Sequence, residues 1–370
     1  MRIVVTADMH IHPYRQCSRD GGHDRLLDGL SALRQSLDLA RREAAVWVMV
    51  GDFKEPKTFW PQQALTGAHE ILREYGDVDK VMLAGNHDAE GIGGSGLAPF
   101  KDIAQVIERP QVLITVASQF ICSPWNADLS VVRTLLEKNP GSPLVAHGFL
   151  AGVVLGPDDT RAPGRGIPLA EYGDFPVAFF GDVHKGQTLV REKNRPPRWE
   201  PYSTTMTPTR SSWKIRGAAP WRGEVFYPGS PYQRNWGERN DGPKGALLAD
   251  LKTGEVWLHE FTAPKFQHLE CDEAELEKLI DKGTLNGWEG DFVRIVYTGR
   301  SSPALNALKD WTFRSLQVIT RREQRAERRA EIHAGMPRRE LLEKYAAARP
   351  LPDADPRRVI EAGMRLSEAE

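Results

Sequence analysis

The chain has 370 residues, of which 40% are hydrophobic and 27% charged, with a formal net charge of −1. This length predicts two or three folding units, and this composition predicts a globular protein with a sizeable core. A total charge near zero does not exclude a nucleic-acid partner, because a basic surface can be local.

Cysteine usage and hydropathy restrict the cellular setting. The three cysteines, Cys17, Cys122 and Cys271, are widely separated and form no CxxC pair, which argues against disulfides and a thiolate zinc site. No apolar stretch approaches the ~20 residues of a membrane span, and no signal segment precedes the first predicted strand. We therefore expect a cytoplasmic protein without membrane contact.

The first 260 residues alternate short apolar runs with helical stretches, which favours an α/β layered fold. Leucines at helical spacing predict a helix over Asp24–Arg42, and a second apolar face predicts another over Gln62–Glu74. The apolar runs predict strands at residues 3–5, 46–50, 81–83, 144–145 and 178–180.

Residues 191–222 interrupt this rhythm and are interpreted as a basic insertion. The segment is rich in Pro, Ser and Thr, and its basic residues are interleaved with tryptophans, a mixture that can bind phosphates and stack on bases. The alternative is that its tryptophans pack on the body and its charges are only solvated. The candidate nucleic-acid contacts are Arg191, Lys193, Arg195, Arg198, Trp199 and Lys214.

Beyond residue 220 the predicted strands follow one another closely, as in an antiparallel edge; they are 224–227, 245–250 and 255–260. A second unit is expected over residues 264–320, and a linker with a helical tail over 321–370. The second unit should contain helices at 272–282 and 304–311 and strands at 292–297 and 315–319. The tail has two amphipathic pieces, 338–347 and 356–366, too small to fold alone. We expect them to dock on the body or on a partner.

Polar clusters follow several of the predicted strands. They are Asp8-Met9-His10, Gly51-Asp52, Gly85-Asn86-His87-Asp88 and Gly181-Asp182-Val183-His184, with an isolated His147-Gly148. The carboxyl ends of strands in an open α/β sheet meet in one crevice. Carboxylate, amide oxygen and neutral imidazole suit Mn²⁺, Fe²⁺ or Mg²⁺. Two such ions ~4 Å apart can clamp a phosphoryl group if one carboxylate bridges them, and Asp52 is the natural bridge.

In this order the clusters resemble the calcineurin-like metallophosphoesterases, whose fold is a layered αββα sandwich, here expected over residues 1–263. The resemblance implies that one ion is held by Asp8, His10, Asp52 and His184. It implies that a second ion is held by Asp52, Asn86, His147 and Asp182. It also implies that His87, oriented by Asp88, protonates the leaving group.

A further match looks like the SbcD-type nucleases and their Mre-eleven counterparts, closest to phage-type members. It consists of Tyr227-Pro228-Gly229-Ser230-Pro231, Trp236-Gly237-Glu238 and Lys244-Gly245. In that family a small α/β capping domain helps to seat DNA, and a C-terminal helical pair binds a coiled-coil SbcC-type ATPase. The resemblance therefore implies a DNA nuclease for end processing or recombination that uses two divalent ions, with Mn²⁺ first and Mg²⁺ or Fe²⁺ as alternatives. It leaves a homodimer open.

Two residues depart from that family's pattern. Asp182 stands where the family has the first His of a Gly-His-x-His motif, and we expect a changed metal preference. Glu55 stands where the family commonly has a His beside the phosphate, and a carboxylate there is expected to repel a phosphodiester.

Two alternative functions remain at this point. A phosphodiesterase or phosphatase for small substrates would share the metal site but would not need the basic segment or the tail. A DNA-end-binding scaffold with weakened catalysis would account for Glu55 and Asp182.

Overall fold

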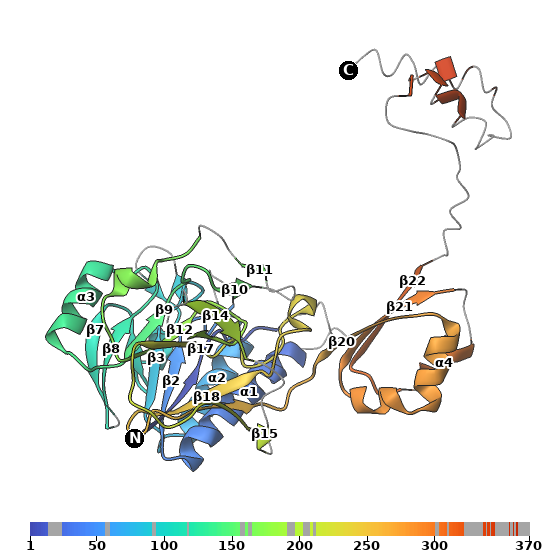
Figure 1. The fold of residues 1–370 in the computed structure, drawn as a ribbon. Coiled ribbons are helices and arrows are strands. Elements are labelled where there is room, and N and C mark those ends of the chain that lie inside the picture. Colours follow the sequence, from blue (N-terminus) through green and yellow to red (C-terminus); the bar gives the residue numbers. More distant parts are fainter. Residues whose placement is uncertain are drawn as a thin grey trace.

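The computed structural model describes residues 1–13, 24–55, 60–90, 94–116, 118–155, 160–161, 165–190, 197–202, 208–209, 212–299, 303–308 and 311–321, with scattered positions between 336 and 361. Within these residues two large sheets pack face to face and helices cover their outer faces (Figure 1). This is the layered αββα sandwich that we expected from the sequence.

The first sheet has eight strands and a parallel centre. Strands β1, β2, β3 and β6 are parallel neighbours, and β18 lies antiparallel to β1. Every residue of the central strand β2 is buried, as is usual where both faces of a sheet are covered. The order is β15 (Pro208–Thr209), β16 (Ser212–Arg216), β19 (Val256–Glu260), β18 (Gly245–Asp250), β1 (Arg2–Thr6), β2 (Val46–Val50), β3 (Lys80–Leu83), β6 (Gln105–Ile107).

The second sheet has seven strands, and its central strands β8, β9, β12 and β17 are parallel. The order is β14 (Arg198–Pro201), β13 (Gln187–Val190), β17 (Glu224–Tyr227), β12 (Val177–Gly181), β9 (Leu144–His147), β8 (Gln119–Ser123), β7 (Gln111–Ile114). The inner faces of the two sheets share a buried apolar core that includes Val5, Val48 and Phe179. This packing brings the ends of β1, β2 and β3 close to those of β9 and β12.

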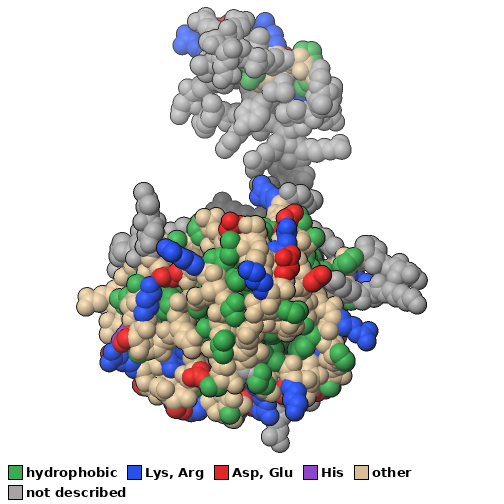
Figure 2. Space-filling model, turned by 90° about the vertical axis from the view of Figure 1, so that its left-hand side faces the viewer, with side chains coloured by type: hydrophobic (Ala, Val, Ile, Leu, Met, Phe, Trp, Pro, Cys, Tyr) green, Lys and Arg blue, Asp and Glu red, His purple; other side chains and the backbone are tan. Residues whose placement is uncertain are grey.

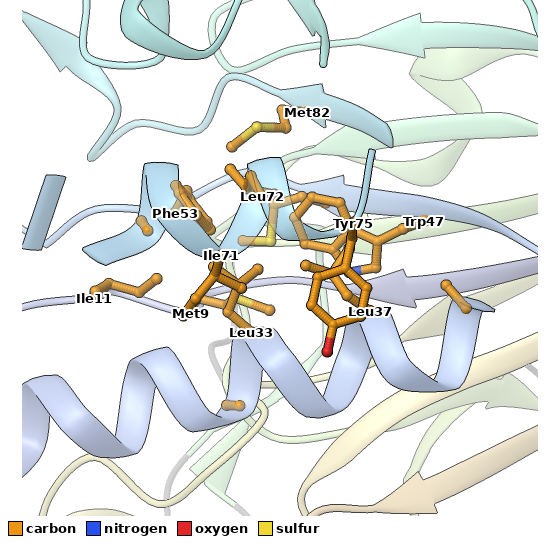
Figure 3. Packing of buried hydrophobic residues seen from close by; sticks show 14 of the residues in the cluster. Met9, Ile11, Leu33, Leu37, Trp47, Phe53, Ile71, Leu72, Tyr75 and Met82 are labelled. Atoms are coloured by element: carbon orange, nitrogen blue, oxygen red, sulfur yellow. The ribbon is translucent and has the colours of Figure 1, made fainter. Parts of the chain in front are cut away.

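Helices α1 (Asp24–Arg42) and α2 (Gln62–Glu74) cover the outer face of the first sheet. Leu33 and Leu37 of α1 and Leu72 of α2 point into one cluster around Trp47 (Figure 3). Both helices have the bounds predicted from their leucine and alanine spacing. Helix α3 (Leu129–Lys138), which the sequence reading missed, covers the second sheet and is capped by Asp128. No helix of the described residues is long and apolar enough to cross a membrane.

Residues 266–321 form a separate small sheet with its own apolar core. Its three strands are parallel and run in sequence order, and the helices lie on one side of it (Figure 1). It is built from β20 (Phe266–Cys271), α4 (Glu273–Asp281), η4 (Thr284–Trp288), β21 (Phe292–Thr298), α5 (Pro303–Ala307) and β22 (Ser315–Arg321). The predicted strands and helices of this unit are found, except that β20 was missed and α5 ends earlier.

Two expectations about the strands are wrong. Strand β17 does not continue an antiparallel edge but lies inside the second sheet, parallel to β12, while β18 and β19 pair in the first sheet. No strand was predicted within 191–222, but the described part of this segment contains β14, β15 and β16, which extend both sheets at their edges. Local sequence does not encode which sheet a strand joins. Most of the two predicted tail helices lies outside the described residues.

The remaining short elements connect the sheets. They are β4 (Ala89–Glu90), β5 (Gly94–Ser95), η1 (Ala98–Phe100), β10 (Val154–Leu155), β11 (Thr160–Arg161), η2 (Leu169–Tyr172) and η3 (Trp236–Glu238).

Candidate metal centre

The predicted ligands gather where the parallel strands of the two sheets end. Asp8 follows β1, Asp52 follows β2, and Asp182 follows β12. The backbone N–H of Asp182 donates to Asp8 Oδ1 at 3.0 Å, so the first and second sheets meet directly at this point. The strand ends therefore form one centre, as the sequence pattern predicts.

The backbone at this centre is strained. Six non-glycine residues of the described chain have a positive φ, and four of them are Asp8, His10, Asp52 and Asp182. Such a conformation is uncommon for residues with a Cβ and persists only where the surrounding structure imposes it. Its concentration in three strand-end clusters indicates a functional site.

Glycines make the close approach of the strand ends possible. A Cβ on Gly51, whose φ is +80°, would lie 2.1 Å from Nδ1 of His147. A Cβ on Gly85 would lie 2.2 Å from the backbone nitrogen of Asp52. Both glycines of the Gly-Asp and Gly-Asn-His-Asp clusters are thus needed for the ligands to converge.

Asp52 lies at the middle of the centre. Its Oδ2 is 3.6 Å from Nε2 of His10, and its Oδ1 is 3.4 Å from Nε2 of His147. Nε2 of His147 lies 3.9 Å from Oδ1 of Asp182. Among the described residues, three sets of three side chains have donor atoms within 4.8 Å of one another. They are Asp8, His10 and His184; Asp8, Asp52 and His147; and His10, Glu55 and His87. This placement matches a bridging role for Asp52 between two sites.

The histidines present the correct nitrogen to a cation. In the rings of His147 and His184 Nδ1 is hydrogen-bonded to an oxygen, so Nδ1 carries the hydrogen and Nε2 keeps its lone pair, and Nδ1 of His10 also lies beside an oxygen. His10 Nδ1 lies 2.6 Å from Glu55 Oε2, His147 Nδ1 2.8 Å from the Val50 carbonyl, and His184 Nδ1 3.0 Å from Glu238 Oε1. The imidazoles are therefore pre-oriented as metal ligands.

The side-chain atoms that face one another around Asp52 are acceptors without hydrogens, as ligands of a cation must be. The amide oxygen of Asn86 lies 3.0 Å from both carboxylate oxygens of Asp52 and 3.1 Å from Nε2 of His147. Acceptors this close repel one another unless a cation lies among them or the amide turns to donate from its nitrogen. A hard divalent ion satisfies carboxylate, amide oxygen and imidazole together.

Burial shifts the pKa values of these groups. Burial, together with Asp52 and Asp182, raises the pKa of Asp8 well above its ordinary value, and burial raises the pKa of Asp52 to about 6. Burial also lowers the pKa of His10, His147 and His184, which keeps these imidazoles neutral. Buried carboxylates of this kind become fully charged ligands when a divalent ion compensates their charge.

His87 lies beside this centre, but Asp88 does not orient its ring as we expected. The His87 ring donates from Nδ1 to the carbonyl of Glu55 at 2.5 Å. The Asp88 carboxylate instead accepts the backbone N–H groups of Asp52, Phe53, Lys54 and Gly85. Asp88, which is fully buried, therefore holds the two loops together through their backbone N–H groups.

Glu238 and Lys244, to which we assigned no role from the sequence, hold His184 in place. Glu238 is buried, contacts His184 through Oε1 and accepts a hydrogen bond from Lys244 at 3.1 Å. Although burial acts to raise it, the pKa of Glu238 is held well below its ordinary value by Lys244 and His184. These residues belong to the Trp-Gly-Glu and Lys-Gly matches, so the signal for them was present in the sequence.

Unlike the predicted metal ligands, the described residues among the predicted nucleic-acid contacts do not lie together at one site. Arg191, Lys193 and Arg195 lie outside the described residues. Arg198 pairs with Glu200 at 2.7 Å, and Lys214 pairs with Glu255 at 2.8 Å.

Trp199 requires a correction. Its ring is 5% exposed within the second sheet's core, and its Nε1 donates to the Ala151 carbonyl. A ring buried in this way cannot stack on a base, so Trp199 is a core residue. On the face in Figure 2, the coloured lysine and arginine side chains are scattered among acidic ones.

Comparison with known proteins places the fold in a family. No curated protein matches this chain. A solved structure of a hypothetical protein from Thermus thermophilus is 12% identical and is matched over 70% of this chain and 100% of that chain, with a TM-score of 0.36. The 5'-nucleotidase precursor from the same organism is also 12% identical, matched over 70% of this chain and 54% of that chain, with a TM-score of 0.34. The family model described as calcineurin-like phosphoesterase matches residues 1–186, half of the chain, and the protein therefore belongs to the calcineurin-like phosphoesterase family.

Proposed function

We propose that this phosphoesterase is a DNA nuclease of the SbcD type that uses two divalent ions, with Mn²⁺ as the preferred metal. One ion would be held by Asp8, His10, Asp52 and His184, and the other by Asp52, Asn86, His147 and Asp182. The mixture of carboxylate, amide and imidazole ligands supports Mn²⁺, with Mg²⁺ or Fe²⁺ as alternatives.

The observation that carries the proposal is that residues of the segment 227–244 contact His184, one of the proposed metal ligands. This segment lies beyond the part of the chain that matches the family model, and it carries the resemblance to SbcD-type nucleases. The backbone N–H of Ser230 and the ammonium group of Lys244 both donate to the His184 carbonyl, at 3.0 and 2.8 Å. Glu238 contacts the ring of the same histidine.

The small sheet over 266–321 adjoins this segment. Trp236, two residues before Glu238, packs edge-on against Phe266 with ring centroids 4.9 Å apart. The guanidinium of Arg294 lies 3.9 Å from the centroid of the Trp236 ring. A capping unit that seats DNA would require a connection of this kind between β20, β21 and the metal centre.

The chemistry follows from the side chains. Divalent ions held at the centre would supply Lewis-acid activation of the phosphodiester and of the attacking water. Because His87 donates from Nδ1 to the Glu55 carbonyl, Nε2 is the nitrogen that can hold the second proton of an imidazolium and pass that proton to the leaving oxygen, which leaves a neutral ring. The backbone N–H of His87 also donates to Asp52 Oδ1 at 2.8 Å, which fixes the ring relative to the bridging carboxylate.

The test is hydrolysis of DNA oligonucleotides by the purified protein with Mn²⁺, compared with hydrolysis of a small phosphodiester. We expect the wild type to cleave DNA. The His87→Ala variant should lose at least about 100-fold in kcat, because removing a general acid costs roughly 10²–10⁴. It should still bind two metal ions per chain. His69→Ala is the matched control, because His69 lies on α2 and contacts Asp102 and Phe100.

Each alternative function predicts a different result in these measurements. Turnover of the small diester without cleavage of any oligonucleotide would replace the nuclease proposal with a small-substrate phosphodiesterase. Tight DNA binding with metal content near zero would favour the scaffold. The proposed SbcC-like ATPase partner is tested by co-purification with the coiled-coil root of such an ATPase.

A further inference from the structure

A cavity of about 280 Å³ lies outside the metal centre. It is lined by Trp213 of β16, by residues of the segment 232–244, and by the connection from β19 to β20. None of the proposed metal ligands lines it. Its volume is near the lower end of small-ligand pockets, which hold ~300–1,000 Å³. The cavity therefore has the size of a site for one small molecule.

Two residues of the cavity wall carry buried polar atoms that have no hydrogen-bond partner among the described residues. One atom is Nε1 of Trp213, a donor, and the other is Oδ1 of Asp241, an acceptor. The Asp241 side chain is only 4% exposed. Buried polar groups in proteins are nearly always paired. A molecule in the cavity that accepts one hydrogen bond and donates another would pair both atoms.

The charges around the cavity select the kind of donor that suits Asp241. Its Oδ2 already pairs with Nζ of Lys244 at 2.8 Å, and Lys265 pairs with Glu260 at 3.1 Å. A second cation at Asp241 would lie close to the Lys244 ammonium and be repelled by it. A neutral N–H group, such as an amino group on an aromatic ring, meets Oδ1 without that repulsion.

Arg239 adds a positive charge to the same wall. Its Nη1 donates to the Trp236 carbonyl at 3.0 Å, and within the described residues its guanidinium forms no ion pair. Arg234 of the same segment differs, because its Nη2 lies 3.3 Å from Oε2 of Glu55. The planar fork of an arginine suits phosphate oxygens. A ligand of this cavity is therefore expected to carry an anionic group such as a phosphate.

We propose that this cavity binds a nucleotide whose base carries an exocyclic amino group. The amino group donates to Asp241 Oδ1, an acceptor atom of the base receives the N–H of Trp213, and the phosphate binds Arg239. Tyr232 and Phe261 supply apolar wall for a planar ring. Adenine, cytosine and guanine carry such an amino group, and thymine does not. The inference goes beyond the proposed function, because binding in this cavity requires neither metal ions nor hydrolysis.

The first test is calorimetry of dAMP, dCMP, dGMP and dTMP with the full-length protein, first with Mn²⁺ and then with EDTA. EDTA abolishes binding at the metal centre, so the binding that remains reports the cavity. We expect at least one of the three amino-bearing nucleotides to bind in both conditions, and dTMP to bind at least about tenfold more weakly. Binding that requires Mn²⁺ for every nucleotide, or equal binding of dTMP, would overturn the proposal.

Two variants test the contacts to the base and to the phosphate. Trp213→Phe removes the N–H and should weaken nucleotide binding in EDTA by roughly three- to tenfold. Arg239→Gln should weaken it by about tenfold or more, because hydrogen bonds to a charged group are stronger. Trp257→Phe is the matched control on the neighbouring strand β19, since Trp257 contacts Lys214 and does not line the cavity. If both cavity variants bind like the control, the nucleotide lies elsewhere.

Asp241→Asn tests the specificity of the cavity. The new side chain should turn its carbonyl to Lys244 and present its N–H₂ group to the base, so a donor replaces the acceptor. The amino-bearing nucleotide should then bind about tenfold more weakly, and dTMP more tightly than it binds the wild type. A merely structural role of Asp241 cannot reverse this preference. Equal weakening of all four nucleotides would therefore overturn the assigned contact.

The nucleotide has two possible sources, a free nucleotide or an unstacked nucleotide of a DNA strand. If it belongs to DNA, Trp213→Phe should raise KM for oligonucleotides of the preferred base and leave KM unchanged for oligo(dT) and for bis(4-nitrophenyl) phosphate. If it is free, KM should stay unchanged for every oligonucleotide while binding of the mononucleotide falls. A wild type that cleaves no DNA but binds the nucleotide in EDTA removes the nuclease proposal and leaves this one in place.

Discussion

Asp88 illustrates how one buried carboxylate organises the backbone of a catalytic loop. Its two oxygens accept four backbone N–H groups, two at 2.8 Å and two at 3.1 Å, from the loops that carry Asp52 and Asn86. Burial, reinforced by the nearby charge of Asp52, raises the pKa of Asp88 to about 6. The carboxylate is retained despite that cost because no neutral side chain of this size accepts as many hydrogen bonds.

Replacing Asp88 by Asn should therefore destabilise the protein and weaken metal binding together. The amide nitrogen would face N–H donors, and loss of charge-assisted hydrogen bonds costs about 1.5–3 kcal/mol each. We expect a lower Tm and fewer bound Mn²⁺ ions. Asp102→Asn, at a carboxylate that is 51% exposed, is the control. A variant with unchanged Tm and full metal content would show that the carboxylate does not hold the loops.

Metal affinity should depend on pH through Asp52. Its pKa of about 6 in the metal-free protein, raised by burial, means that protons compete with metal as the pH falls through 6. The pKa of His147 and of His184 is lowered by burial, so these rings stay neutral and do not add to the competition at that pH. We expect Mn²⁺ affinity, measured by calorimetry, to fall by at least about tenfold per pH unit below 6, because Asp8, whose pKa burial also raises, binds a competing proton as well. Equal affinities at pH 5.5 and 7.5 would contradict this.

At the scale of elements, helix α1 stabilises the first sheet through one face. Leu33 is fully buried against Trp47 and its neighbours, whereas Leu27 of the same helix is 60% exposed. Leu33→Ala should lower the free energy of unfolding by about 2–5 kcal/mol, the usual cost of emptying a buried leucine site. Leu27→Ala should change it by less than about 0.5 kcal/mol. Denaturant unfolding measures the free energy of unfolding of both variants. Equal losses in the two variants would show that Leu33 does not lie on the face of α1 that packs on the sheet.

Elements with a strong local pattern were predictable from the sequence, and α1 and α2 have the predicted bounds. The ligand clusters were predictable because Asp, Asn and His recur directly after several apolar runs, and the carboxyl ends of strands in an α/β sheet meet in one crevice. The assignment of β17 to the second sheet was not predictable, because its local pattern is the same in either sheet. The positions of Arg234 and Trp199 depend on long-range contacts with Glu55 and Ala151, which no periodicity encodes.

For the whole molecule, Arg25 contributes to the contact between the sandwich and the small sheet. This arginine of α1 is 1% exposed, pairs with Asp28 at 2.7 Å and donates to the Gln233 carbonyl. Its guanidinium lies 5.4 Å from the ring centroid of Phe266 in β20 and 5.1 Å from that of Phe292 in β21. From the small sheet, Arg314 also pairs with Asp28 at 2.7 Å.

Arg25→Met should therefore loosen the small sheet without disturbing the metal centre. Removing one partner of a buried ion pair costs about 3–5 kcal/mol, and Arg314 compensates part of this at Asp28. We expect amide hydrogen exchange in β20 and β21 to become roughly tenfold to 100-fold faster, since each 1.4 kcal/mol is a factor of ten. Metal content should not change, because Arg25 contacts none of the proposed ligands in the described structure.

Arg34→Met is the control on the same helix, because Arg34 is 45% exposed and pairs with Glu74 on α2. It should leave exchange in β20 and β21 as in the wild type. If Arg25→Met behaves like Arg34→Met, the two units are held together by other contacts, such as the hydrogen bond from the Phe266 N–H to Gln233. If exchange rises in β20 and β21 and DNA cleavage falls while hydrolysis of the small diester persists, the small sheet acts on DNA through its placement beside the centre.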